Sequence, residues 1–121
     1  VAYNRRRGSV FAADAARHII LEFLPDSSGG AIQSFDAAIV AWGSVSVRGD
    51  ADGLALSAAR LRSPHGLVLD AMAQVLYAAD TGNGKVRALD LASSQVSSIV
   101  FGLSEPQALT LDPGSGELFV A

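Results

Sequence analysis

One short pattern occurs three times in this chain of 121 residues. In each copy, a brief apolar segment ends in Asn or Asp, about four turn-forming or polar positions follow, and a second apolar segment begins. The copies align without a gap over 1–14, 67–80 and 109–121. The second and third copies also share an upstream proline, Pro64 and Pro106, which are 42 residues apart. A fixed period of this length is typical of folds that repeat one supersecondary unit.

Each period has room for four short strands and their turns. In the second copy we expect strands over 67–70, 75–79, 85–89 and 96–101, because these segments are rich in β-branched and aromatic residues. Four antiparallel strands in each repeat are typical of one blade of a β-propeller. The sequence therefore predicts an all-β propeller with four-stranded antiparallel blades.

The first copy has extra residues in its connections. Asp14 and Asp80 are 66 residues apart, which exceeds the period by 24. We expect a fourth strand over 37–42, with Trp42 packed between blades, and a single helical turn over 55–61. The expected organisation is a first blade with a truncated start over 1–63, including a long interblade linker over 43–63, then a complete blade over 64–105 and the start of a third blade over 106–121.

The second copy resembles the NHL repeat. It carries Pro-x-Gly-apolar-x-apolar-Asp and then Leu-Tyr-x-Ala-Asp-Thr-Gly-Asn-x-Lys-Val-Arg within 64–87, and the linker carries Gly-Asp-x-Asp-Gly at 49–53. The first copy departs from the pattern where Ala15 and Ala16 replace Thr-Gly. The resemblance implies a propeller, commonly of six blades, so that this chain forms an incomplete ring.

Two blades leave sheet edges and blade faces open, whereas a closed ring covers them. We therefore expect the chain to belong to a larger propeller, with other blades of that propeller as its first partners, in a multidomain protein or assembly. Association of several copies into a ring is the alternative.

Composition limits the chemistry. The chain has no cysteine, which excludes disulfides, thiolate zinc sites and cysteine nucleophiles. A formal net charge of −3 argues against a large nucleic-acid footprint. No apolar run reaches the roughly 18–20 residues of a membrane span. Because no nucleophile motif or phosphate-binding loop occurs either, we assign no catalytic residue and no cofactor.

His65 and Gln107 occupy equivalent positions before the innermost strands of two blades, near one mouth of the expected channel. We name both as candidate binding residues. Among NHL-like propellers, the peptide-amidating lyases hold zinc with histidines around such a channel. A zinc site needs three or four convergent ligands, and His18, the other histidine, aligns with an outer turn. We therefore assign no metal.

A basic cluster, Arg5, Arg6 and Arg7, lies on the first expected hairpin turn and is a second candidate binding surface. Three arginines can bind phosphate or an acidic protein, and NHL propellers of the tripartite-motif type bind RNA on a basic face. Because no second basic strip accompanies the cluster, a solvated turn or a protein contact is favoured over nucleic acid.

Several polar residues fit structural roles in turns. Asp14 and Asp80 follow equivalent strands, where an Asp side chain can accept bonds from turn N–H groups. Gly82 and Asn83 can adopt positive φ in the same turn. Asp50 and Asp52 alternate as in a calcium loop, but no bidentate Glu follows, so a turn is favoured.

These features favour a non-catalytic NHL-type propeller segment that serves as a protein- or ligand-binding scaffold. A metal-dependent lyase or hydrolase with its site in the channel is the first alternative, and an RNA-binding NHL propeller is the second. Ligand-type residues equivalent to His65 in other blades would favour the enzyme, and further Arg and Lys at the turns would favour RNA binding.

Overall fold

The structure, a computed structural model, describes residues 1–25 and 35–121. Three antiparallel sheets make up this part of the chain, and α-helix is absent from it. The first sheet contains β1 (Ala2–Asn4), β2 (Ser9–Asp14), β3 (Ile19–Pro25) and β4 (Phe35–Gly43) in that order. The fold class is therefore all-β with antiparallel sheets, as the alternation of strands and turns predicts.

The second sheet is larger, and the third has two strands. The second contains β6 (Pro64–Asp70), β7 (Val75–Asp80), β8 (Lys85–Asp90) and β9 (Gln95–Val100), with β5 (Gly53–Leu54) paired to the outer edge of β9. The third contains β10 (Leu109–Leu111) and β11 (Leu118–Val120). A 3-10 turn, η1 (Thr81–Asn83), connects β7 to β8.

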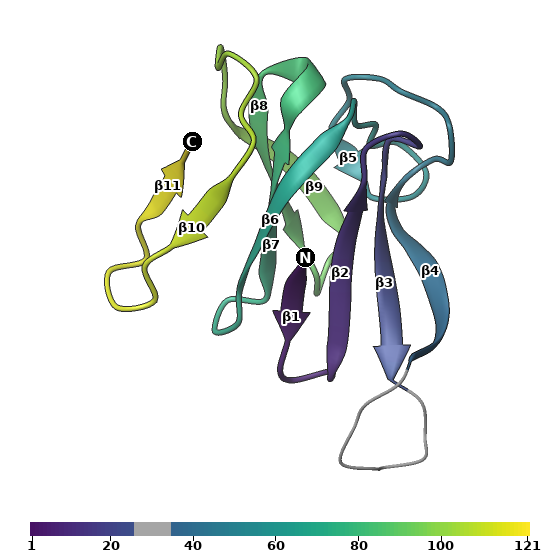
Figure 1. The fold of residues 1–121 in the computed structure, drawn as a ribbon, viewed down its shortest axis with the longest axis vertical. Coiled ribbons are helices and arrows are strands. Elements are labelled where there is room, and N and C mark those ends of the chain that lie inside the picture. Colours follow the sequence, from purple (N-terminus) through teal and green to yellow (C-terminus); the bar gives the residue numbers. More distant parts are fainter. Residues whose placement is uncertain (26–34) are drawn as a thin grey trace.

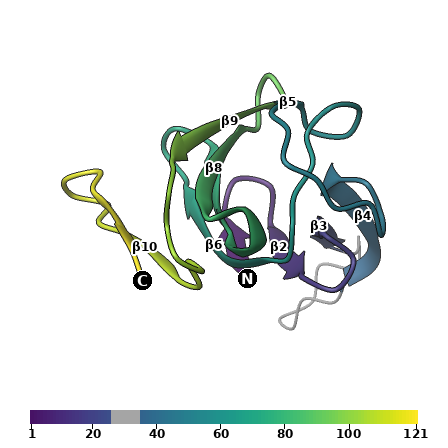
Figure 2. The same cartoon turned by 90° about the horizontal axis from the view of Figure 1, so that it is seen from above.

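The first strands of the three sheets are neighbours. Strand β6 contacts β1 on one side and β10 on the other. Figure 1 shows the second sheet between the other two, and Figure 2 shows the same order from above. The described residues form no closed ring. Within them, no helix is long and apolar enough to cross a membrane.

The core lies between the first two sheets and includes the linker that joins them. Trp42 is fully buried in this core, among side chains of the first sheet, the linker and the second sheet. Burial of one large apolar side chain contributes about 1.5–3 kcal/mol. The core residues are Ala2, Phe11, Ile20 and Trp42 of the first sheet, Ala55, Ala59 and Leu61 of the linker, and Leu67, Leu76, Ala78, Leu89 and Val96 of the second sheet.

The linker differs from its prediction. It supplies the short strand β5, in which Gly53 pairs with Val96 and Leu54 with Gln95. This pairing satisfies backbone groups that an edge strand leaves open. The helical turn expected over 55–61 is reduced to a hydrogen-bonded turn, in which the N–H groups of Ala58 and Ala59 donate to the Leu54 carbonyl at 3.0 and 2.9 Å.

The turn between β7 and β8 also differs from its prediction. Gly82 and Asn83 can adopt positive φ, but in the structure the positive φ of this turn, 63°, is at Gly84. Gly82 is needed for a different reason, because a Cβ there would lie 2.5 Å from Arg62 Cγ of the linker. The turn is therefore shaped by its contact with the linker as well as by its own backbone.

Smaller differences concern strand ends. Strand β6 begins three residues earlier than expected, at Pro64, and β9 runs from Gln95 to Val100 rather than over 96–101. Strand β4 runs from Phe35 to Gly43, and so extends beyond the expected 37–42.

Candidate functional site

His65 lies at the start of β6, with its side chain exposed to solvent. Its Nδ1 is 2.9 Å from the Ser63 carbonyl oxygen and 3.0 Å from Thr81 Oγ1. The Thr81 hydroxyl donates to the Pro106 carbonyl at 2.6 Å. Since both neighbours then accept, a neutral His65 ring carries its proton on Nδ1, and its Nε2, which has no partner among the described residues, can accept a hydrogen bond.

The Gln107 backbone lies against Gly66, the residue after His65. A Cβ at Gly66 would be 2.6 Å from the Gln107 carbonyl oxygen, so the backbones of β6 and of the segment before β10 approach closely there. The Gln107 side chain is exposed. The structure thus brings these two candidate binding residues to one end of the sheets. Within the described residues, no group of three or more His, Cys, Asp or Glu side chains is arranged to hold a metal ion.

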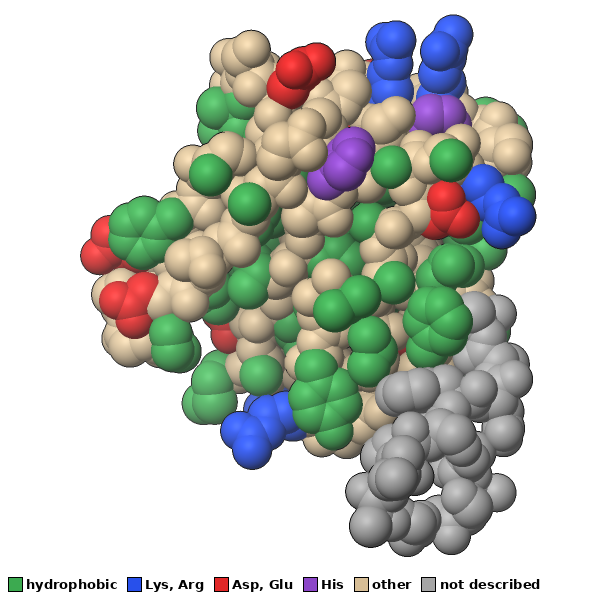
Figure 3. Space-filling model, in the orientation of Figure 1, with side chains coloured by type: hydrophobic (Ala, Val, Ile, Leu, Met, Phe, Trp, Pro, Cys, Tyr) green, Lys and Arg blue, Asp and Glu red, His purple; other side chains and the backbone are tan. Residues whose placement is uncertain are grey.

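The second histidine, His18, accepts a hydrogen bond from the Ser63 backbone. The Ser63 N–H donates to His18 Nδ1 at 2.9 Å, while the Ser63 carbonyl faces His65. His18 is in the turn between β2 and β3, as its alignment predicts. The two histidines are visible near the upper end of the face in Figure 3.

The three arginines lie at the opposite end from His65. They form the turn between β1 and β2, and Asn4 beside them donates from Nδ2 to Gln74 Oε1 in the turn after β6, at 3.1 Å. Arg5 and Arg6 are exposed. Arg7 turns toward β3, where its Nη1 lies 3.2 Å from Glu22 Oε1. The five candidate binding residues therefore divide between two ends of the molecule.

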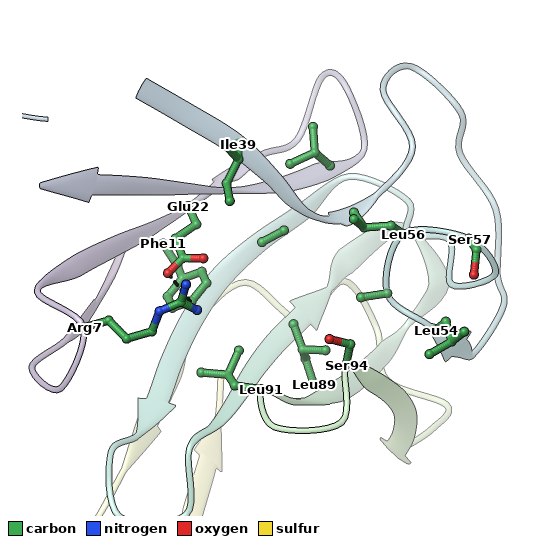
Figure 4. A pocket seen from close by; sticks show the side chains of 13 residues that line it. Arg7, Phe11, Glu22, Ile39, Leu54, Leu56, Ser57, Leu89, Leu91 and Ser94 are labelled. Carbon is green, nitrogen blue, oxygen red and sulfur yellow. Dashed lines mark ion pairs between the residues drawn. The ribbon is translucent and has the colours of Figure 1, made fainter. Parts of the chain in front are cut away.

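A cavity of about 420 Å³ lies between the first two sheets and the linker. Its walls are mostly apolar, and Arg7 and Glu22 stand together at one end (Figure 4). The lining residues are Arg7, Phe11, Glu22, Ile39, Val40, Ala41, Leu54, Ala55, Leu56, Ser57, Leu89, Leu91 and Ser94. This size and lining are typical of small-molecule sites.

Glu22 is the least expected member of the cavity. Its side chain is only 5% exposed, although a carboxylate is costly to bury without partners. Ser9 Oγ donates to Glu22 Oε1 at 2.7 Å, and Arg7 supplies the opposite charge. A sequence signal existed, because Glu22 interrupts an otherwise apolar strand, Ile19–Leu24.

An ionic cluster, buried at Arg87 and Asp80, connects the linker to the second sheet. The Arg87 side chain is completely buried on β8. Its Nε donates to Asp80 Oδ2 at 2.7 Å, its Nη1 donates to Asp52 Oδ1 at 2.8 Å, and its Nη2 donates to Asp50 Oδ1. Lys85 Nζ also donates to Asp50 Oδ1, at 2.7 Å. Two acidic residues at alternate positions of the linker, Asp50 and Asp52, therefore pair with two basic residues at alternate positions of β8, Lys85 and Arg87.

The bonds of Asp80 differ from the expected turn bonds. Its Oδ1 accepts from the N–H of Arg62 in the linker at 2.8 Å, and its Oδ2 accepts from Asn83 Nδ2 at 2.8 Å. Asn83 also donates to the Gly49 carbonyl at 2.6 Å. Asp14 does bond its own turn, accepting from the Arg17 N–H at 3.2 Å. Asp80 and Asn83 therefore hold the linker, whereas Asp14 holds a local turn.

Acid is expected to weaken the ionic cluster through Asp50. The hydrogen bond from Lys85, aided by the charge of Arg87, holds the pKa of Asp50 below its usual 3.8 against the opposing effect of desolvation. Because the folded pKa is the lower one, Asp50 stabilises the fold above its unfolded pKa, and this contribution is lost as the pH falls through the folded pKa. Urea unfolding measured between about pH 5 and 3 should show that acid lowers the free energy of unfolding less in Asp50→Asn than in the native protein. An equal loss in both would contradict this role.

Comparisons with known proteins identify structural relatives only. No model of a known protein family matches the chain, and no curated protein matches it significantly. An auxiliary nutrient binding protein from Bacteroides thetaiotaomicron VPI-5482 is similar, with a TM-score of 0.81 and 14% identity over 98% of this chain and 33% of that one. A protein of unknown function from the same organism gives 0.79 and 18%, over 98% of this chain and 31% of its own.

A third solved structure agrees with these two. An auxiliary nutrient binding protein from Bacteroides ovatus ATCC 8483 has a TM-score of 0.77 and 17% identity, over 93% of this chain and 32% of that one. The chain thus spans about a third of the length of each relative. At these identities the likeness is one of fold, and the all-β arrangement of this chain is shared with proteins named for nutrient binding.

Proposed function

We propose that the chain forms part of an NHL-type β-propeller and serves as a non-catalytic ligand-binding scaffold. In this proposal, 1–63 is a blade with its linker, 64–105 is a complete blade, and 106–121 begins a third. The adjacency of β1, β6 and β10 supports this arrangement, because the innermost strands of successive blades are neighbours. The fold similarity to proteins named for nutrient binding supports a binding role.

The observation that carries the binding role is the cavity between the first two sheets. Its volume of about 420 Å³ is within the range of roughly 300–1,000 Å³ that small-molecule sites occupy. Paired strands β2, β3, β4, β5 and β8 supply about half of the lining residues named above, and these positions need little rearrangement to accept a ligand. It also combines apolar walls with a few fixed polar groups, which give a ligand both affinity and orientation.

The experiment uses a neutral apolar fluorescent probe, N-phenyl-1-naphthylamine, with the intact protein. We expect saturable binding at one site per chain. Ala41→Phe places a larger side chain at the cavity wall and should weaken binding by about tenfold or more. The matched control is Ala16→Phe, in the exposed turn between β2 and β3, which should leave binding unchanged.

Two results would reject this function for the cavity. One is the absence of saturable probe binding by a folded protein. The other is binding that Ala41→Phe and Ala16→Phe affect equally, because the probe would then lie elsewhere. Circular dichroism of both variants shows whether the sheets are retained.

A further inference from the structure

The polar end of the cavity contains one positive and one negative group in direct contact. Glu22 comes from the middle of β3, and Arg7 comes from the turn between β1 and β2. Their closest atoms, Arg7 Nη1 and Glu22 Oε1, are 3.2 Å apart. Figure 4 shows both side chains at the end of the cavity away from Leu54 and Ser57.

This pair offers both a donor and an acceptor to a ligand. Among the described residues, the hydrogen bond from Ser9 and the ion pair with Arg7 both involve Oε1 of Glu22. Oε2 therefore keeps its capacity to accept a hydrogen bond. The Arg7 guanidinium has five N–H donors, and its side chain is 48% exposed, so donors remain for a ligand.

Taking the cavity as the binding site of the proposed function, we propose that it selects a neutral ligand with an apolar body and a head group that both donates and accepts hydrogen bonds. A primary amide or a hydroxyl group has this chemistry. Its N–H or O–H donates to Glu22, and its oxygen accepts from Arg7.

A charged head group is disfavoured because the two charges nearly cancel. Because the two groups are 3.2 Å apart, an anion attracted by Arg7 is also repelled by Glu22, and a cation attracted by Glu22 is also repelled by Arg7. Either ion still loses its hydration on entering an apolar cavity, and no net attraction offsets that loss. A neutral amide or alcohol loses less hydration and bonds to both side chains.

The apolar body is selected by the remaining walls. Leu89 lies on β8, and Leu91 is the residue after that strand. Ile39 and Val40 come from β4, and Leu54 comes from β5. Each CH₂ group that these side chains remove from water should strengthen binding by about fourfold. Ser57 and Ser94 add hydroxyl groups away from the charged pair.

The test compares four ligands that share one chain and differ in the head group. Octanamide, 1-octanol, octanoate and octylammonium compete with N-phenyl-1-naphthylamine for the intact protein at neutral pH. We expect the two neutral ligands to bind about tenfold more tightly than either ion. Octanoate or octylammonium binding as tightly as octanamide would overturn the proposal.

Charge-altering variants test the role of each side chain. Glu22→Gln keeps an oxygen for the Ser9 hydroxyl but removes the negative charge that balances Arg7. The affinity for octanoate should therefore rise about tenfold relative to the affinity for octylammonium. Arg7→Gln should produce the opposite change. Arg48→Gln, at an exposed position of the linker outside the cavity lining, is the control and should preserve the native order of ligand affinities. An unchanged order in Arg7→Gln, whose half-exposed side chain is tolerant of replacement, would overturn the proposal even if Glu22→Gln did not fold.

These outcomes are distinguishable from failure of the proposed function. If the fluorescent probe binds and Ala41→Phe weakens its binding, the cavity is a ligand site, whatever the order of affinity of the four ligands. A wrong order then rejects the ligand class alone. If the probe does not bind, or binds without regard to Ala41→Phe, the proposed function itself is wrong.

Discussion

Replacing Arg87 by Leu is expected to lower the free energy of unfolding by about 3–5 kcal/mol. The substitution leaves the buried Asp80 carboxylate without its charge partner and removes the Arg87 bonds to Asp50 and Asp52 of the linker. An unpaired buried charge is costly because the protein interior solvates it poorly. Urea unfolding of the intact protein, followed by circular dichroism, measures the change.

Lys85→Met is the matched control, because Lys85 lies on the same strand and binds the same Asp50. Both carboxylate and amine are partly exposed in that pair, so its loss should cost about 1 kcal/mol or less. Similar losses in Arg87→Leu and Lys85→Met would show that burial of Arg87 does not set the strength of the cluster.

Replacing Trp42 by Ala is expected to destabilise the fold by a comparable amount, about 3–5 kcal/mol. Trp42 is fully buried among side chains of the first sheet, the linker and the second sheet, so its loss leaves a cavity that all three border. The unfolding midpoint in urea, with an unchanged slope, should report this loss.

Trp42→Phe separates the volume of the ring from its polar atom. Within the described part of the chain, Trp42 Nε1 is a buried donor without a hydrogen-bond partner. Phenylalanine removes this donor while keeping most of the apolar ring, so the variant should lose much less stability than Trp42→Ala. Equal losses would mean that Trp42 does not fill the space between the sheets.

The sequence predicted the strands well and the linker poorly. Strands such as Val75–Asp80 carry β-branched and aromatic residues between clear turn residues, and these local signals are enough to place them. Strand β5 has two residues inside a long insertion, where no periodicity can develop. It exists because the edge of β9 offers backbone groups to pair, which is a tertiary effect.

The turn chemistry shows the same limit. The sequence identified a turn over 81–84, but the residue with positive φ depends on how the turn meets its neighbours. A Cβ at Gly84 would collide with the Leu103 carbonyl, and a Cβ at Gly82 would collide with Arg62. Neither contact is visible from local residue preferences.

The candidate site was only partly accessible to sequence reasoning. His65 and Gln107 were placed together by the repeat, and their role in binding stays a prediction. The cavity draws its walls from segments as far apart as Arg7 and Ser94, so no local motif marks it. Two signals were present: the single carboxylate of Glu22 within an apolar strand, and the alternating charges of 50–52 and 85–87.

An experimental structure of the intact protein tests most directly whether successive sheets surround a common axis. We expect β1, β6 and β10 to be neighbouring innermost strands of a closed ring, with Tyr3, Leu69 and Leu111 at equivalent positions. We also expect the cavity between the first two sheets. Sheets stacked face to face as a sandwich, or innermost strands separated by other elements, would contradict this expectation.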